Sequence, residues 1–204
     1  MTQQPELRID TPSALCSLGP RPLVMTGYLI QLLRQHFADP NNIEDANFRH
    51  PPEGAHDYVW RQGKESGIVI ESATRWDPNQ TGQRPGIFVK RNEWGAIHRG
   101  INDQHMGNLS WDATERFTYF LRGSHTLFCV AGESGEAEKL GTEVYREIGQ
   151  FAPVIRKNLN LHRFQFLQVG QLGKLREATD NYAVSVSVGY AFEESWVIRQ
   201  HAPR

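Results

Sequence analysis

Two histidines and two acidic residues stand close together in one polar segment. They are His50, Glu53, His56 and Asp57. Imidazole and carboxylate groups are common ligands of zinc and other transition metals, so this segment is a candidate site for a small metal-dependent hydrolase. None of the eight histidines forms the i, i+4 pair of a helical zinc site, and no His-Glu-x-x-His motif occurs. Metal binding by this loop is therefore an alternative and not the leading hypothesis.

Other catalytic motifs are absent from the sequence. The turn at residues 132–135 lacks the Lys-Ser/Thr pair of a P-loop, and its Glu133 would repel phosphate. No Gly-x-Ser-x-Gly elbow provides a nucleophilic serine. Cys129 stands in an apolar run, where a small core residue is expected and not a reactive thiol. We predict no enzyme activity, no catalytic residue, no metal and no cofactor.

Basic and aromatic residues alternate in the middle of the chain, and they are the candidate binding residues. The set is Trp76, Arg84, Lys90, Arg91, Trp94 and Arg99. Such interleaving is used to bind nucleic acid, but Trp and Arg are also enriched at protein–protein interfaces. The chain has 22 basic and 23 acidic residues, a net charge of −1, and no named nucleic-acid motif. We predict a protein interface, with DNA binding and an ordinary solvated surface as alternatives.

A β-hairpin is expected to position these residues. Residues 67–72 and 86–91 have the composition of strands, and residues 76–85 between them are rich in turn formers. The sequence Asn92-Glu93-Trp94-Gly95 predicts another turn after the second strand. The expected hairpin therefore has a wide, charged tip.

The clearest pattern lies between residues 124 and 198 and predicts the order β-α-β-β. The predicted strands, including one that precedes this stretch, are residues 115–121, 125–131, 164–169 and 183–190. Gly123-Ser124 is expected to divide the first two, which then pair. In the last strand, Val184, Val186 and Val188 alternate with small or polar residues, so one face belongs to the core and the other is solvated or closely approached. Residues 195–198 extend this strand or add an edge.

Two amphipathic helices are predicted to pack on this sheet. Residues 135–151 place apolar side chains at helical spacing, with Ser134 as N-cap and Pro153 as a break or kink. Residues 25–37 predict a shorter helix, with Thr26 as N-cap and Asp39-Pro40 as its end. The fold class expected is α+β, with a mostly antiparallel sheet and both helices on it.

Composition divides the rest of the chain. Residues 1–22 contain four prolines and predict an extended arm, whereas residues 23–204 predict a single domain with polar insertions at 41–66 and 98–115. The hydrophobic content is 39% and the mean hydropathy is −0.54, so we expect long polar loops or surface that another chain covers. No apolar run approaches the length of a membrane span and the N-terminus has no signal-peptide pattern, so we expect a soluble protein from a reducing compartment.

The C-terminal half also resembles a known family. The strand Gly123-Ser124-His125-Thr126-Leu127-Phe128-Cys129-Val130-Ala131 leads into the helix start Ala137-Glu138-Lys139-Leu140, and a β-β pair then ends in Tyr190 and Trp196. This order is similar to that of the tail terminator (tail-completion) proteins of tailed bacteriophages, with residues 28–37 as the leading helix. Arg84-Pro85-Gly86-Ile87-Phe88-Val89 resembles the R-P-x-I/V-x-V strand of phage neck and tail-completion proteins.

This resemblance implies a structural virion protein that is assembled in the host cytoplasm. Its expected partners are copies of itself in a ring, expected to be a hexamer, the tail tube protein, and a neck or head-closure protein. No membrane partner is expected, and nucleic acid would only pass through the ring lumen. The Pro-rich arm and the insertions at 41–66 and 98–115 depart from compact family members. A head-closure or tail-adaptor ring protein is therefore the alternative.

Overall fold

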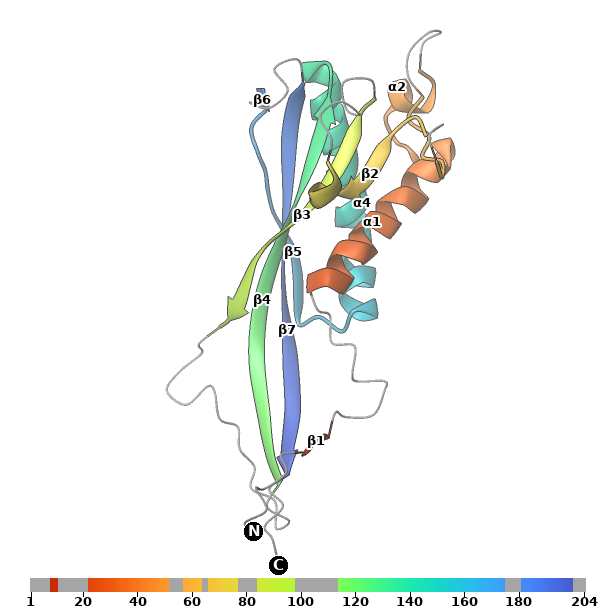
Figure 1. The fold of residues 1–204 in the computed structure, drawn as a ribbon. Helices are drawn as coiled ribbons and strands as arrows, with labels where there is room; N and C mark the ends of the chain where they lie inside the picture. The colour runs from red at the N-terminus through yellow and green to blue at the C-terminus, as the bar shows by residue number, and fades with distance from the viewer. Residues whose placement is uncertain are drawn as a thin grey trace, which may run out of the picture.

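The computed structural model describes residues 8–10, 22–51, 57–63, 66–76, 84–97, 114–174 and 181–199, of which 8–10, 114–118 and 195–199 are described by their backbone alone. These residues form an α+β fold in which helices cover one face of a mixed sheet (Figure 1). The strands are β1 (Arg8–Asp10), β2 (Val69–Ser72), β3 (Gly86–Ala96), β4 (Thr114–Ala131), β5 (Arg163–Val169), β6 (Gly173–Lys174) and β7 (Tyr182–Arg199). The helices are α1 (Pro22–Ala38), α2 (Ala46–Arg49) and α4 (Ser134–Asn158), with 3-10 turns at Pro40–Asn42 and Ala73–Arg75.

Two long strands, β4 and β7, form the axis of the sheet. They pair antiparallel along their whole length, from Thr114 opposite Arg199 to Ala131 opposite Tyr182. The strand order is β1-β7-β4-β3-β2, and β5 and β6 also pair with β7. Each long strand has 18 residues, so the β4–β7 ribbon is about 60 Å long at about 3.3 Å per residue. Its lower half extends well beyond the helices (Figure 1).

The predicted core and both predicted helices are confirmed. Val186 and Val188 of β7 are buried on the helix side of the sheet, together with Leu140 and Val144 of α4. Helix α1 adds its own apolar face, and buried Cys129 lies in the same cluster. An alternating strand and an amphipathic helix each have one apolar face, and these two faces meet here.

The predicted helix boundaries need three corrections. Helix α1 begins at Pro22, because proline suits the first helical position, and Thr26 lies inside the helix, where its hydroxyl donates to the Pro22 carbonyl at 3.0 Å. In α4, Glu133 occupies the N-cap position without a side-chain hydrogen bond, so Ser134 is the first helical residue and not the cap. Pro153 does not end α4, which continues because Ile155 of the next turn is buried in the core.

The predicted division at Gly123-Ser124 is wrong, because β4 is one continuous strand. Gly123 lies beneath the ring of Tyr190, and a Cβ built on Gly123 would be 2.6 Å from the Tyr190 hydroxyl oxygen. The glycine therefore makes room for an aromatic ring on the neighbouring strand and does not mark a turn. At the other end, residues 195–198 extend β7.

The predicted hairpin is also wrong, because β2 and β3 are parallel. Val69 pairs with Gly86 and Ser72 with Val89, so the chain crosses over between the two strands. The expected turn at residues 92–95 belongs to β3, which stays paired with β4 to Ala96 and has a bulge between Arg91 and Trp94. Strand composition predicts that a segment is extended, but it does not determine the direction in which the segment joins the sheet.

The predicted insertions and arm are described in part. Within 41–66, Ile43 and Phe48 are buried, so this stretch contributes to the core despite its polar composition. Of the insertion at 98–115, only residues 114 and 115 are described, and they begin β4; of the arm at 1–22, only β1 and Pro22 are described. None of the helices in the described segments has the length and apolar character needed to cross a membrane.

Two glycines of α4 provide a matched test of how closely this helix packs on β7. A Cβ on Gly141 would lie 2.9 Å from a methyl carbon of buried Val184, whereas Gly149 has no heavy atom within 4 Å of the same position. We expect Gly149→Ala to raise the free energy of unfolding by about 0.5–1 kcal/mol, because alanine favours the helix. Gly141→Ala should lower it by about 1–2 kcal/mol, because overpacking outweighs that gain. Chemical denaturation measures both, and equal effects would contradict the packing.

Candidate functional site

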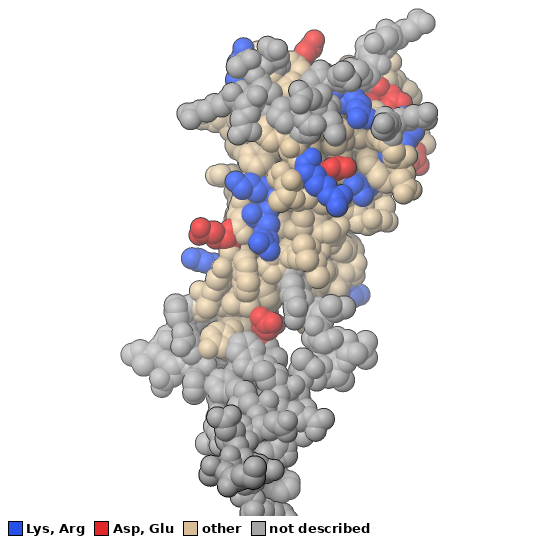
Figure 2. Space-filling view, in the orientation of Figure 1, with Lys and Arg blue, Asp and Glu red and all other residues tan. Residues whose placement is uncertain are grey.

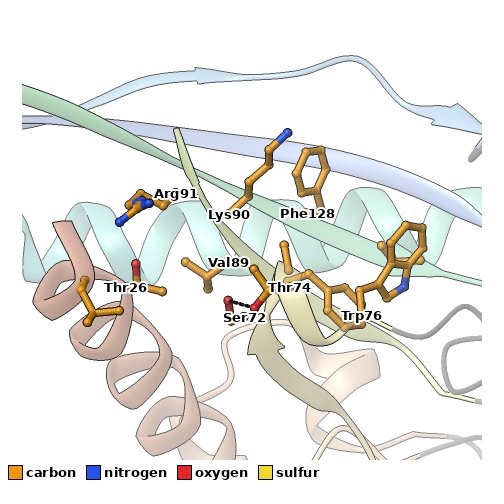
Figure 3. Close-up of a pocket in the computed structure, with 12 residues that line it drawn as sticks. Thr26, Ser72, Thr74, Trp76, Val89, Lys90, Arg91 and Phe128 are labelled. Atoms are coloured by element: carbon orange, nitrogen blue, oxygen red, sulfur yellow. Dashed lines mark hydrogen bonds between the residues drawn. The ribbon is translucent and has the colours of Figure 1, made fainter. Parts of the chain in front are cut away.

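A groove of about 730 Å³ opens where β2 ends beside β3. Its apolar wall includes Trp76, Phe88 and Phe128, and the N-terminal turns of α1 contribute Leu23 and Thr26. Lys90 and Arg91 of β3 complete the rim (Figure 3). The groove therefore combines an apolar wall with charged side chains at its rim.

The groove reaches both faces of the sheet around the edge of β3. Ile87 pairs with Cys129, and both side chains lie in the main core on the helix side. Phe88 pairs with Phe128 and therefore lies on the opposite face. There Phe88, Val69 and Val130 form a second small cluster, against which Trp76 packs with its ring centroid 5.9 Å from that of Phe88.

The charge at this groove is mainly positive. Arg75, Lys90 and Arg91 are exposed, and none of them forms an ion pair within the described segments. Lysine and arginine side chains gather across the middle of the face seen in Figure 2, over β2 and β3. Lys90 and Arg91 are successive residues of a strand, so they lie on opposite faces of the sheet. Glu93, at the bulge, is the nearby acidic residue of β3.

The structure brings together three of the six residues that the sequence singled out. Trp76, Lys90 and Arg91 all line the groove. Arg84 lies elsewhere, beside the outer edge of β2, where its Nη1 donates to the Ser66 carbonyl at 2.9 Å. Trp94 is farther along β3 and 49% exposed, and Arg99 lies outside the described residues.

Sequence reasoning missed two groups of residues at this end of the sheet. Leu23 and Phe128 line the groove but are distant in sequence from Lys90, so no local pattern connects them. Arg34 of α1 was also missed. Its Nε and Nη2 donate to the Ile70 carbonyl at 3.1 and 2.8 Å, and its guanidinium lies 5.0 Å from the centre of the Trp60 ring. Arg34 thereby occupies the outer edge of β2.

The candidate metal loop is described only at its ends. Glu53 and His56 lie outside the described residues, and Asp57 forms an ion pair with Arg61 at 2.7 Å. Among the described residues, no group of three His, Cys, Asp or Glu side chains has the arrangement of a metal site. The DNA-binding alternative placed a hairpin between Arg84 and Arg99, whereas residues 86–96 form the single strand β3 and Arg99 lies outside the described residues.

A buried ionic group joins the two long helices. His36 of α1 lies 2.9 Å from Glu143 through Nε2 and 2.9 Å from Glu147 through Nδ1, and all three side chains are buried. Burial lowers the pKa of His36, but the hydrogen bonds and charges of the two carboxylates outweigh it and raise that pKa to about 9. Burial alone would raise the pKa of Glu143, but its hydrogen bonds with His36 and with the Glu44 and Asp45 amides hold it below the usual value. This imidazolium has no access to a substrate and holds the helices together.

A second buried histidine is neutral. His125 of β4 lies behind α1, with Nε2 at 2.8 Å from the Thr26 hydroxyl. Burial, assisted by the charge of Arg91, lowers its pKa to about 4. Burial also raises the pKa of Tyr190 to about 12 and that of the Cys129 thiol well above its usual range. These groups are poor acids, bases or nucleophiles at neutral pH.

The sequence matches no protein-family model, and no curated protein matches it.

The His36 group predicts a defined pH dependence of stability. The folded-state pKa of His36 is raised, so its contribution is complete below about pH 6.5 and is lost as the pH rises towards 9. The contribution of Glu143, whose pKa is lowered, is present above about pH 4.5 and is lost as the pH falls. We expect the free energy of unfolding to fall by roughly 2 to 3 kcal/mol between pH 6.5 and 9.5.

Urea unfolding across this pH range measures the loss, and NMR titration of the His36 imidazole measures the pKa directly. Glu147→Gln is the matched variant, because it removes one charge and retains an acceptor for the imidazole. In Glu147→Gln the pKa of His36 should be lower and the alkaline loss of stability smaller. A wild-type His36 that titrates below pH 7 would contradict the ionic link.

Proposed function

We propose that this chain is a structural virion protein that resembles a phage tail terminator, forming a ring that caps the tail tube and joins it to the neck. The observation that carries the proposal is the β4–β7 ribbon, which continues beyond the helix-covered body (Figure 1). A two-stranded ribbon is marginally stable in water by itself. In the extended half, the described part of the chain adds the three residues of β1 to the edge of β7. A ribbon of this kind is suited to lie against other subunits, which would cover it.

Exposed apolar side chains at the opposite edge of the sheet from the groove also support assembly. Tyr145 of α4 packs on Phe166 of β5, and it is 42% exposed. Leu167 and Val169 of β5 are each 47% exposed. Strand β5 lies beyond β7, whereas the groove lies beyond β4 at β3. The groove at β3 and the apolar surface at β5 are different surfaces at opposite edges of the sheet. Such a pair favours head-to-tail contacts between copies, and these contacts close into a ring when the rotation between neighbouring subunits is a whole fraction of a full turn.

The oligomeric state of the purified chain tests the proposal. We expect ring-shaped oligomers in negative-stain images and a sedimentation coefficient well above that of a 23.3 kDa monomer, or assembly into rings when tail tubes are added. The position of the labelled protein in the particle, at the tube end or at the head side of the joint, separates a tail terminator from a head-closure or tail-adaptor ring. A folded protein that stays monomeric and ignores tail tubes would overturn the proposal.

Two neighbouring residues of β5 offer a matched pair for the lateral contact. Val169 and Gln168 are both exposed and point to opposite faces of the strand. We expect Val169→Asp to shift the oligomer towards monomer by at least tenfold in dissociation constant, because a carboxylate would be desolvated in an apolar contact. Gln168→Asp carries the same new charge and should change assembly much less. Sedimentation equilibrium measures both, and circular dichroism checks that each variant is folded.

A further inference from the structure

The edge of β3 is paired along only part of its length. Strand β2 pairs with residues 86–89, and the rest of β3 pairs with β4 on its other side alone. No described strand pairs with the outer edge of residues 90–96. The amide and carbonyl groups along such an edge are a template for a further strand.

The outer edge of β2 differs, because a side chain already occupies it. The two hydrogen bonds from Arg34 satisfy the Ile70 carbonyl, at 3.1 and 2.8 Å, and Trp60 covers the guanidinium. A carbonyl that already accepts two hydrogen bonds from a side chain is not available to an amide of a further strand. Among the described residues, the edge of β2 is therefore occupied at Ile70, whereas the outer edge of β3 beyond Val89 has no strand paired with it.

The groove offers contacts on both faces of a strand added to β3. Successive side chains of a strand point to opposite faces. On one face they would meet Leu23 of α1, which lines the groove and is 73% exposed. On the other face they would meet Trp76 and Phe128 (Figure 3). A groove that wraps around a strand edge in this way fits an extended chain better than a compact small molecule.

The charges beside the β3 edge indicate which residues a strand added there should carry. Lys90 and Arg91 project to opposite faces and line the groove. The exposed Arg75 adds a positive charge in the 3-10 turn after β2, whereas Glu93 is the single acidic residue within residues 90–96. Two successive carboxylates in an added strand would therefore each face a basic side chain, with apolar residues on either side of them for the groove walls. Strand β5, the apolar edge of a second copy, instead carries Arg163 and glutamines and is a poorer complement.

We infer that the groove is the docking slot for an extended acidic segment of a partner protein, which pairs with residues 90–96 of β3 as an added strand. This inference rests on the proposed assembly role and names the chemistry of one partner. The recognised segment places two neighbouring acidic residues between apolar residues. Backbone hydrogen bonds provide the affinity, and Lys90 and Arg91 provide the selectivity.

Binding of a defined peptide to the full chain tests the inference. The probe is fluorescein-labelled Thr-Val-Val-Asp-Asp-Val-Val-Thr-amide, and the matched peptide has Lys-Lys in place of Asp-Asp. We expect the acidic peptide to bind at least tenfold tighter in fluorescence anisotropy, and more weakly as salt is raised. Lys90→Glu/Arg91→Glu should weaken binding at least tenfold. The control Arg156→Glu/Lys157→Glu, an exposed basic pair in the last turn of α4, should leave the affinity unchanged.

Two measurements separate an added strand from a merely electrostatic contact. Peptide binding should slow hydrogen exchange of β3 amides in residues 90–96. N-methylation of one alternate set of peptide amides should abolish binding, whereas methylation of the other set should leave it within threefold. Equal binding of the acidic and basic peptides, no binding of either, or indifference to both methylation patterns would overturn the inference.

The test also distinguishes this inference from the proposed function. If the chain forms rings but does not bind the acidic peptide, the proposed function stands and the inferred docking slot is overturned. If the chain binds the peptide but stays monomeric and does not assemble with tail tubes, the docking slot stands and the proposed ring function is overturned. If Lys90→Glu/Arg91→Glu dissolves the oligomers, a second copy occupies the groove and the assignment to another protein is overturned.

Discussion

The buried contact of His36 with Glu143 and Glu147 is the constraint on which the arrangement of the body depends. It joins α1 to α4 through a protonated imidazole that has a carboxylate on each nitrogen. Glu143 also accepts the amides of Glu44 and Asp45, so the segment after α1 is tied to the same point. Breaking a buried ionic contact leaves an uncompensated buried charge, which is costly. The contact therefore holds α1 and α4 in one relative position. The two helices therefore lie on the sheet as one layer.

The helix layer covers one face of the sheet, so the described helices leave the far face and the strand edges uncovered. Arg34 extends from α1 to the outer edge of β2, whereas Lys90 and Arg91 border the accessible edge of β3. Small polar side chains cover much of the far face, where Asn92 donates to the hydroxyls of Ser124 and Thr126. These surfaces present backbone groups, positive charge and apolar side chains.

Residues that are close in sequence were easier to interpret than residues that are close in space. The spacing of Leu140, Val144 and Ile148 predicted α4, and the alternation of Val184, Val186 and Val188 predicted β7, because helix and strand periods are local properties. Of the residues that line the groove, the sequence singled out Trp76, Lys90 and Arg91, as interface residues and not as parts of a groove. Leu23 and Phe128 could not be assigned to it, because they reach it through tertiary packing.

The sequence by itself determined the two long helices, the extended character of most residues in β2, β3, β4, β5 and β7, and the buried faces of α4 and β7. Only the tertiary structure decided that β2 joins β3 in parallel and that β4 continues through Gly123. The physical reason is that strand direction depends on the route of the connecting chain, and the role of a glycine depends on what packs against it. For Gly123 that neighbour is Tyr190, 67 residues away in the chain but on the adjacent strand. The spacing of apolar residues predicts which face of a helix or strand is buried, but it does not predict which residues pack against that face.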